Sequence, residues 1–475
     1  MGEGIGRVFF LKDEVGFQPL SNHQGLVVKL LESWREGDEP LALSPKTKER
    51  LLLAARYHDD GKRFTFHIVP DGKGGLTYSF RGHRFRVAQA VQDPYAQALI
   101  RGHHDYSTRE VVNLAADFLE EGLGHRFPED LFLLMMADQL EAELAVRLWQ
   151  RRAGEVRPFV EFDLLPDGEG GFLLDPWPFR VDEVALDFLV YFHPYRGEEA
   201  KVVEGWGRAL VGALEEGKVP EAFREEKRRV RLRPWAAAAR KADDPEAFYA
   251  RFGLKPTPFQ REVFKVAEGD PAHLLLAPTG TGKTEAAAFP ALARGERLVF
   301  VLPTRSLVDD LEGRFRRYLK ILAQEEGRPK ALVVDTGHRQ ARFRFSPDGQ
   351  EEATKERHLY HADVILTTLD KLLYRYFGYA EGVKSYTFPR RIHDRRTLFV
   401  FDEVHLYEAT AWVNFRHLIA SLYKAGVRFL VMSATMPGTY REELLLEGTL
   451  EHPAAKRPSR VLRYMPQGNP MEIIQ

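Results

Sequence analysis

Continuous apolar runs alternate with helical patterns in the second half of the chain. The runs read RLVFVLP (297–303), ALVVDTG (331–337), ADVILTTLD (362–370), TLFVFDEVH (397–405) and RFLVMSAT (428–435). Uninterrupted Val, Leu and Phe runs are typical of strands buried on both faces, and helices between them indicate parallel crossovers. The pattern therefore predicts a parallel α/β sheet, with ligands at the carboxyl ends of its strands.

The first part of the chain, to about residue 150, has a different period. Apolar residues recur there at intervals of three and four, which predicts helices at 47–57, 88–100 and 128–148. Gly61 is expected to supply a left-handed end after the first helix. In the third helix, Asp138 falls on the apolar stripe formed by Leu131, Leu134, Met135, Ala142 and Ala145. These patterns predict an all-α N-terminal domain.

A connector follows the helical part. Residues 160–178 predict a hairpin around Asp167-Gly168, and a helical stretch runs on to about Glu215. Residues 221–235, EAFREEKRRVRLRPW, are dense in Arg and Lys, and a solvated helix face or a DNA-backbone contact explains them equally well. We expect an N-terminal domain with connector over 1–235, a second domain over 236–455, and a tail or the start of another lobe over 456–475.

Composition narrows the class of protein. Hydrophobic residues make up 44% of the 475 residues and charged residues 29%, as in soluble globular proteins. The formal net charge is −1, so any nucleic-acid contact needs local Arg and Lys surfaces. With no cysteine, a metal must be held by His and carboxylates. The N-terminus lacks a secretory signal pattern and no apolar run approaches the ~18 residues of a membrane span, so a cytoplasmic protein without membrane contact is expected.

The stretch LLLAPTGTGKT (274–284) predicts a strand, a phosphate-binding loop and the first turn of a helix. Gly280 and Gly282 leave room for backbone N–H groups to surround phosphates. Lys283 and Thr284 stand where a phosphate cation and a Mg²⁺ hydroxyl ligand belong, and Thr279 and Thr281 complete the loop. Ala277 replaces the first glycine of the strict G-x-x-x-x-G-K-[ST] pattern, and a simple strand-to-helix turn is the alternative for this loop taken alone.

Further polar groups follow the predicted strands. Asp402 could hold Mg²⁺ through water, and Glu403 could orient or deprotonate the attacking water. PTRSLVDD (303–310) and TTLD (367–370) suit contacts with the backbone of a single strand, and SAT (433–435) could link the nucleotide to that grip. Gln260, in TPFQ, is placed to bond an adenine edge.

From about residue 250 to 440, this order and spacing of motifs resembles a superfamily 2 DExH-box helicase. The resemblance implies a first RecA-like lobe that binds ATP and Mg²⁺. It also implies a second lobe with arginine fingers, yet no Q-x-x-G-R-x-x-R follows Thr435. The expectation is either a truncated gene or a second helicase lobe on a separate polypeptide, and weak ATP turnover without that lobe.

Histidines and two aspartates mark the N-terminal part as a candidate metal site. An unpaired carboxylate such as Asp138 on a buried face is costly, so it needs a cation, a metal or strong donors. Taken alone, each His is more easily explained as a solvated or hydrogen-bonded side chain. Together, imidazoles and carboxylates without a thiol suit Mn, Fe, Co or Ni. The set comprises His23, His58, Asp59, His83, His103, His104 and Asp138.

YHDDGK (57–62), with an earlier His, a later single His, a His-His pair and a late Asp, resembles the HD superfamily of metal-dependent phosphohydrolases. Its order is similar to the HD nuclease domain of the type I CRISPR-associated helicase-nuclease. The resemblance implies that His23, His58, Asp59 and Asp138 hold one metal, while Asp59 bridges to a second metal held by His83, His103 and His104. It also implies Lys62 near the phosphate and activation of water between two metals. Asp60 is expected to face outward.

The leading functional expectation is a metal-dependent nuclease for single-stranded DNA joined to an ATP-binding helicase lobe, acting in antiviral defence with the CRISPR surveillance complex. Asp59, Lys62 and Glu403 are the expected catalytic residues. An RNA or DNA-repair helicase with an HD nucleotide phosphohydrolase is the second interpretation. A scaffold that binds ATP or DNA without turnover is the third.

Overall fold

The computed structural model divides into two compact units, Met1–Ala236 and Ala237–Gln475, which are described separately. The structure describes residues 2–36, 39–40, 45–86, 90–104, 108–124, 126–150, 163–175, 179–181, 184–234, 244–266, 272–278, 280–354, 362–376, 397–424, 427–436, 440, 443–444 and 449–451. The expected tail at 456–475 lies outside these residues. No helix among them combines the length and the apolar character that crossing a bilayer requires.

Unit 1 contains a six-stranded sheet, so the expectation of an all-α domain is wrong. Its order is β1-β2-β10-β11-β8-β7, and all neighbours are antiparallel except β11 and β8. Two smaller sheets pair β5 with β6, and β3 with β4 and β9. The strands are β1 Ile5–Phe10, β2 Glu14–Pro19, β3 Trp34–Glu36, β4 Glu39–Pro40, β5 His67–Pro70, β6 Leu76–Ser79, β7 Asp163–Pro166, β8 Phe172–Asp175, β9 Phe179–Val181, β10 Val184–Pro194 and β11 Arg224–Pro234.

Two strands account for this error. β10 buries Leu186, Phe188, Val190 and Phe192, an alternation of period two within a stretch that was expected to be helical. β11 is the Arg- and Lys-rich segment, and it pairs with β10 along its length. The hairpin expected around Asp167-Gly168 is confirmed as β7–β8.

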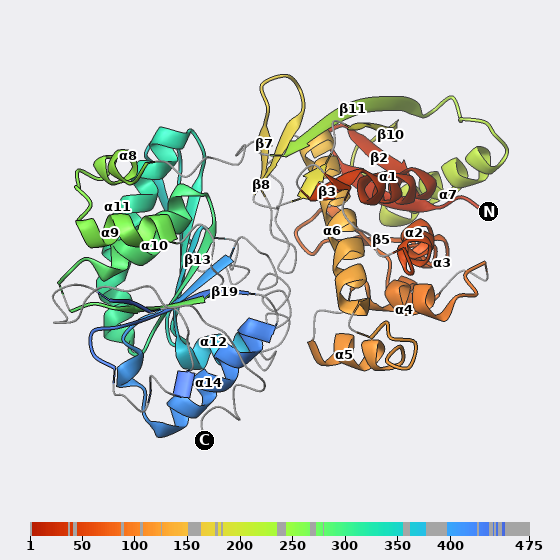
Figure 1. The fold of residues 1–475 in the computed structure, drawn as a ribbon. Coiled ribbons are helices and arrows are strands. Elements are labelled where there is room, and N and C mark those ends of the chain that lie inside the picture. The colour runs from red at the N-terminus through yellow and green to blue at the C-terminus, as the bar shows by residue number, and fades with distance from the viewer. Residues whose placement is uncertain are drawn as a thin grey trace. The chain divides into compact units, whose positions relative to one another are not determined.

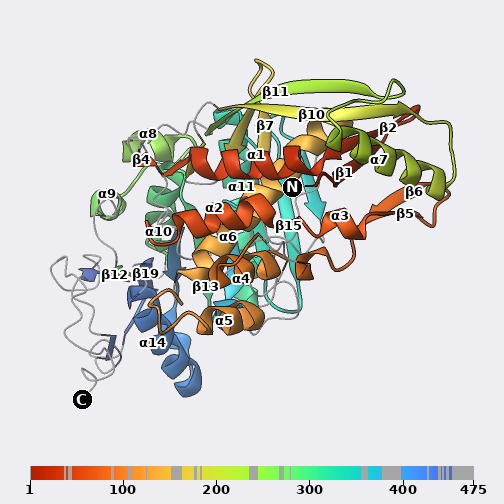
Figure 2. The ribbon, with the colours of Figure 1, turned by 90° about the vertical axis from the view of Figure 1, so that its right-hand side faces the viewer.

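The helices of unit 1 pack against one another and against this sheet (Figures 1 and 2). α6 contacts α1, α2, α4 and α5, and α1 also contacts β1 and β10. α6 is buried at every position from Asp130 to Ala145, instead of along one stripe. The helices are α1 Leu20–Ser33, α2 Lys48–Tyr57, α3 Lys62–Thr65, η1 His83–Phe85, α4 Pro94–Gly102, α5 Thr108–Ala116, α6 Phe127–Ala145, the π-helical turn η2 Val146–Gln150, and α7 Ala200–Glu215.

Unit 2 is a RecA-like α/β lobe, as the apolar runs predicted. Its sheet order is β16-β15-β14-β17-β13-β18-β19-β12-β20. In this spatial order, the last seven strands, which begin with β14 and end with β20, are parallel. The strands are β12 Ala272–Leu276, β13 Arg297–Leu302, β14 Lys330–Asp335, β15 Gln340–Phe345, β16 Glu351–Thr354, β17 Val364–Thr368, β18 Thr397–Phe401, β19 Arg428–Ser433 and β20 Thr449–Glu451.

Helices cover both faces of this sheet and create two cores (Figure 1). α8, α9, α10 and α11 lie over one face, and α12 and α14 lie over the other. This arrangement brings the expected motifs to the carboxyl edge of neighbouring strands. The helices are α8 Pro245–Ala250, α9 Pro258–Val266, α10 Lys283–Ala293, α11 Arg305–Glu326, α12 Leu369–Tyr376, η4 Val404–Leu406 and α14 Ala409–Lys424.

Candidate metal centre and nucleotide site

Three histidines of unit 1 are held in the same way by local backbone. The Nδ1 atoms of His58, His83 and His103 lie 2.8, 2.7 and 2.5 Å from the carbonyl oxygens of Ala55, Phe80 and Ile100. A carbonyl can only accept, so Nδ1 carries a proton and Nε2 is the ring nitrogen left to face the donor groups. Each imidazole follows its carbonyl by three residues at the end of a helix or within a turn. Local folding therefore fixes both the tautomer and the direction of these rings.

The seven predicted ligands converge on two groups that share Asp59. The first donor group is His23, His58, Asp59 and Asp138, and the second donor group is Asp59, His83, His103 and His104. Within each group the candidate ligand atoms lie within 4.8 Å of one another. Helices α1, α2, α4 and α6 and the turn η1 bring them together from positions up to 115 residues apart in the chain (Asp138 less His23).

Asp59 uses one oxygen for each group. Its Oδ2 lies 2.9 Å from Nε2 of His23 and 3.4 Å from Nε2 of His58. Its Oδ1 lies 3.0 Å from Nε2 of His83 and 3.5 Å from Nε2 of His103. Lys62 places Nζ 2.5 Å from Oδ2 of the same carboxylate. A carboxylate between two donor sets has the geometry of a bridging ligand.

The side chain that orients His23 was not predicted. Glu141, fully buried on α6, accepts from Nδ1 of His23 at 2.6 Å, so Nε2 of His23 faces Asp59. Arg7 of β1 and Gln18 of β2 donate to the Glu141 oxygens at 2.9 and 2.7 Å. A carboxylate behind a ligating His is a common way to fix its tautomer. The sequence signal that could have found Glu141 is its spacing, because it follows Asp138 by three residues and so lies on the same face of that helix.

The charges within the cluster favour a bound cation. Burial alone would raise the pKa of Asp59, but the Lys62 ammonium and the His58 imidazole hold that pKa well below its usual range. Burial disfavours a charged His58, yet Asp59 and Asp138 raise the pKa of His58 to about 10. Burial and the His103 ring lower the pKa of His104 well below its usual range. The two carboxylates therefore stay ionised and attract positive charge.

The donors fit a pair of divalent transition metals. His58 Nε2, His103 Nε2 and Asp59 Oδ1 are buried and make no hydrogen bond with the described residues, although burying such atoms unpaired is costly. All three belong to the donor groups. Imidazole nitrogens with carboxylate oxygens are the ligand set that suits Mn, Fe, Co or Ni.

Two residues near Asp59 differ from expectation. Asp60 was expected to face outward, but it is 7% exposed and pairs with Arg63 at 2.7 Å. Gly61 was expected in the left-handed region, but its φ is −60°. Glycine is required there for space, since a Cβ would lie 2.0 Å from the carbonyl oxygen of His83.

The phosphate loop of unit 2 has the predicted form. Gly280 and Gly282 adopt φ of 83° and 79°, a region that glycine tolerates best. The loop leads into α10, which begins at Lys283, with Thr284 next and Thr281 half-buried. Thr279 lies outside the described residues. The Gln260 side chain donates to the Gly282 carbonyl at 3.1 Å, so it braces the loop.

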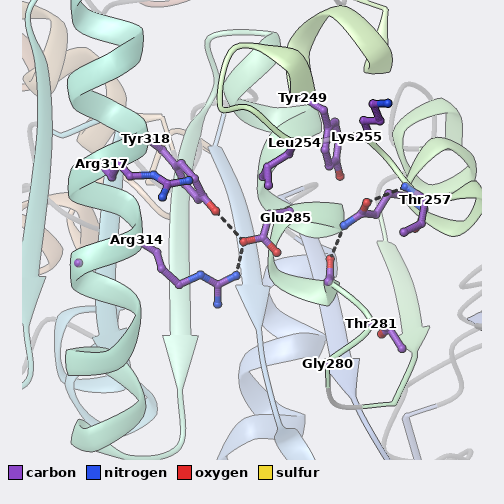
Figure 3. Close-up of a pocket in the computed structure, with 13 residues that line it drawn as sticks. Tyr249, Leu254, Lys255, Thr257, Gly280, Thr281, Glu285, Arg314, Arg317 and Tyr318 are labelled. Atoms are coloured by element: carbon purple, nitrogen blue, oxygen red, sulfur yellow. Dashed lines mark hydrogen bonds and ion pairs between the residues drawn. The ribbon is translucent and has the colours of Figure 1, made fainter.

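A cavity of about 500 Å³ borders this loop (Figure 3). Gln260, Gly280, Thr281 and Gly282 line it from the loop side. From α11, the Tyr318 hydroxyl donates to Glu285 at 2.8 Å, and Arg314 pairs with the same carboxylate. The sequence offered no signal for Glu285 and Arg314, because they meet only through the packing of α10 on α11.

The acidic pair after β18 contacts the phosphate loop. Glu403 lies 2.8 Å from Nζ of Lys283 and adopts φ of 49°, the only positive φ of a non-glycine among the described residues. Burial and the neighbouring Glu403 raise the pKa of Asp402 to about 6, although Lys283 opposes this. His405 meets the Ser433 hydroxyl at 2.8 Å. The SAT motif therefore contacts the segment that follows β18, and its expected role in linking the nucleotide to a bound strand stays a prediction.

The remaining strand-end motifs form a second cavity, of about 550 Å³. Pro303, Thr304 and Arg305 follow β13, and Thr368 and Asp370 belong to the end of β17. Residues that were not predicted complete its lining: Thr336, Gly337, His338, Lys371 and Tyr374.

The Arg- and Lys-rich segment of unit 1 is not a free basic surface. Every cation of β11 lies beside a carboxylate, as Arg229 does at 3.0 Å from Asp187. The solvated helix face is therefore wrong, because the segment forms strand β11, and the pairing of its cations gives no support to a DNA-backbone contact. The other five pairs are Arg224–Glu14, Lys227–Glu225, Arg228–Glu226, Arg231–Glu169 and Arg233–Glu169.

Comparison with known families adds an independent finding. A sequence model of the DEAD/DEAH box helicase family matches residues 257–444. The CRISPR-associated helicase Cas3 of Thermoproteus tenax is 29% identical over 197 residues, which cover 38% of this chain and 32% of that protein. The CRISPR-associated nuclease/helicase Cas3 of Methanothermobacter thermautotrophicus is 24% identical over 330 residues, 67% of this chain and 35% of that protein. The chain thus spans about a third of the length of these relatives (32% and 35%).

Solved structures give more distant matches. The crystal structure of T. fusca Cas3 with ADP is 17% identical, covers 90% of this chain and 50% of that chain, and has a TM-score of 0.43. The DUF1998 helicase MrfA bound to DNA and AMPPNP is 18% identical, covers 41% of this chain and 26% of that chain, and has a TM-score of 0.31. Likenesses at this level establish no function.

Proposed function

Because this chain is a relative of the CRISPR-associated Cas3 helicases, as its motifs predicted, we propose that it joins a metal-dependent nuclease for single-stranded DNA to an ATP-driven helicase lobe. In this proposal it degrades the strand displaced by a CRISPR surveillance complex during antiviral defence. The observation that carries the nuclease half is the sharing of Asp59 by two donor groups.

The metals would supply a polarised water and neutralise the charge of a phosphodiester. The chain's own residues supply the frame. His23, His58 and Asp138 would hold one metal, His83, His103 and His104 the other, and Asp59 would bridge them. Lys62, whose ammonium lies 2.5 Å from Asp59, would attract a phosphate toward the metals. Glu141 keeps the Nε2 atom of His23 directed into the first donor group.

In the helicase half, the phosphate loop and Lys283 would bind ATP, Asp402 would hold Mg²⁺, and Glu403 would orient water. The Lys283–Glu403 contact at 2.8 Å supports these roles, because it places the phosphate cation beside the water-orienting carboxylate. The cavity along Pro303–Arg305 and Thr368–Asp370 would hold a single strand at the same edge of the sheet.

A metal-dependence assay tests the nuclease half. The chain, stripped with a chelator, should lose cleavage of circular single-stranded DNA and regain it with Mn²⁺ or Ni²⁺, while metal analysis reports two ions per chain. Degradation of deoxynucleoside triphosphates or RNA in place of DNA would favour the nucleotide phosphohydrolase or the RNA helicase. Absence of hydrolysis from a fully metal-loaded chain would leave only a binding role.

A further inference from the structure

The donor cluster opens to solvent on one side. Five of its seven residues are buried, whereas His83 and His104 are half-buried. The Lys62 side chain, beside Asp59, is also partly accessible. A phosphodiester would therefore reach the cluster past His83, His104 and Lys62.

A tight turn, Phe80–Arg86, forms part of this open side. The amide nitrogens of His83, Phe85 and Arg86 donate to the carbonyl oxygens of Phe80, Gly82 and His83. The Phe80 ring packs inward against Phe66 and Tyr78, with centroids 5.8 and 5.4 Å apart. These contacts anchor the 80–86 turn on its inner side.

The outer side of the same turn carries exposed aromatic and basic side chains. Phe85 is 66% exposed, and the Arg84 guanidinium lies 4.7 Å from its ring centre. Arg81 and Arg86 are exposed, and neither has an ion-pair partner among the described residues. By contrast, the six cations of β11 in the same unit all lie beside carboxylates.

A second exposed aromatic ring lies on the neighbouring element. Phe64 of α3 is 65% exposed, three residues after Gly61. The Gly61 backbone touches the His83 carbonyl, so α3 and the 80–86 turn adjoin. Large exposed apolar side chains beside free cations mark an interaction surface.

We propose that the 80–86 turn binds single-stranded nucleic acid at the mouth of the metal centre. Arg81 and Arg86 bind backbone phosphates, while Phe85, assisted by Phe64, stacks on unpaired bases. Single strands offer base faces and phosphates together, and stacking on an aromatic ring accepts any base. Duplex DNA hides its base faces, and a free nucleotide carries no run of backbone phosphates along which two arginines could bind. The inference rests on the proposed nuclease function and adds the residues that would hold its single-stranded substrate.

Cleavage kinetics of the full, Mn²⁺-loaded chain test this proposal. Phe85→Ala should raise the KM for a single-stranded oligonucleotide about tenfold, with kcat within about twofold of wild type, and Phe85→Trp should restore it. Arg81→Gln with Arg86→Gln should raise KM and lower the salt dependence of log KM by ~0.7 per arginine. Leu119→Ala, another exposed apolar residue, and Arg229→Gln, a paired arginine, are matched controls and should change neither quantity.

Two further measurements separate this site from the metal centre. Hydrolysis of bis(p-nitrophenyl) phosphate, a diester with neither a nucleobase nor a second phosphate, should be unchanged in the arginine variants. An oligonucleotide carrying 5-iodouridine, irradiated with the metal-free chain, should crosslink to Phe85 or Phe64. An unchanged KM, an equal loss of bis(p-nitrophenyl) phosphate hydrolysis, or crosslinks confined to residues after 236 would overturn the proposal. Failure of wild-type hydrolysis with the crosslink retained would overturn the nuclease function alone.

Discussion

The two candidate sites are held in place by different means. In the donor groups, four imidazole Nδ1 atoms bond to groups behind the site, three to carbonyls and one to Glu141, so the Nε2 atoms point inward before any ligand arrives. In the nucleotide site, Lys283 and Glu403 pair with each other. The imidazoles of the candidate metal centre are therefore oriented from behind, whereas in the candidate nucleotide site a phosphate would compete with Glu403 for the Lys283 ammonium. Substitutions of the groups that orient the imidazoles should therefore weaken the candidate metal centre. The candidate nucleotide site should respond mainly to substitutions of Lys283 and Glu403 themselves.

The largest effect is expected from Asp59→Asn. The change removes the one carboxylate that both donor groups share, so metal content should fall from two ions toward none. Cleavage of single-stranded DNA should fall by more than ~100-fold, because loss of a group that only hydrogen-bonds a metal ligand already costs up to about 100-fold. Asp60→Asn is the matched control, because Asp60 pairs with Arg63 instead. Wild-type cleavage by Asp59→Asn would contradict the shared-carboxylate arrangement.

Lys283→Ala tests the independence of the two sites. Loss of a charge-assisted phosphate contact should cost about 1.5–3 kcal/mol, or about 10- to 150-fold in ATP affinity, measured by calorimetry. Cleavage of single-stranded DNA in the absence of ATP should be unchanged. Lys371→Ala, at the other cavity of the lobe, should leave ATP affinity intact. Parallel loss of ATP binding and cleavage would indicate one composite site.

Gly61→Ala tests how closely the backbone supports the second donor group. Its Cβ would meet the His83 carbonyl oxygen at 2.0 Å, so the turn that carries His83 must move. We expect a loss of about 1–3 kcal/mol in the free energy of unfolding, together with weaker binding of one of the two metals. Denaturant titration and metal analysis report both. Gly25→Ala, where a Cβ meets nothing within 4 Å, should not destabilise the chain.

Glu141→Gln tests the orientation of His23 from behind the donor groups. It keeps the shape of the side chain but removes the charge that bonds His23 and Arg7. Metal affinity, measured by competition with a chelator, should fall about 10- to 100-fold, the usual cost of an altered partner behind a ligand. Glu143→Gln, whose carboxylate pairs with Arg147, is the control. Equal affinity in the two variants would show that His23 needs no oriented tautomer.

Sequence reasoning succeeded where chemistry is local or strongly patterned. The phosphate loop and the Asp402–Glu403 pair end buried strands, so their apolar runs located them. The seven candidate ligands were chosen by residue type and order, and the structure brings them together. Whether they bind metal stays a prediction. Glu141 was missed because a buried glutamate has no distinctive flanks until Arg7 and Gln18 pack around it.

The sheet of unit 1 was missed for a physical reason. β2 pairs with β10 and β8 with β11 across long stretches of sequence, and the charges of β11 hide the alternation of Val230 and Leu232. β10 could have been found from Leu186, Phe188 and Val190, since period two separates strand from helix. The cavity along β13, β14 and β17 was found only in part, because His338 and Tyr374 enter it through folding of distant segments.

The pairing of strands in the unit 1 sheet has a consequence for the order in which the domain can fold during synthesis. β1 and β2 pair with each other locally, but β2 also pairs with β10, which ends at Pro194, and β10 pairs with β11, which ends at Pro234. The contacts of Arg7 and His23 with Glu141 likewise span more than a hundred residues, with separations of 134 and 118. Such distant pairings form slowly. On the ribosome, the seven-residue cluster can therefore form only after the helices that carry it have emerged. The sheet of unit 1 can be completed only later, after β11 has emerged.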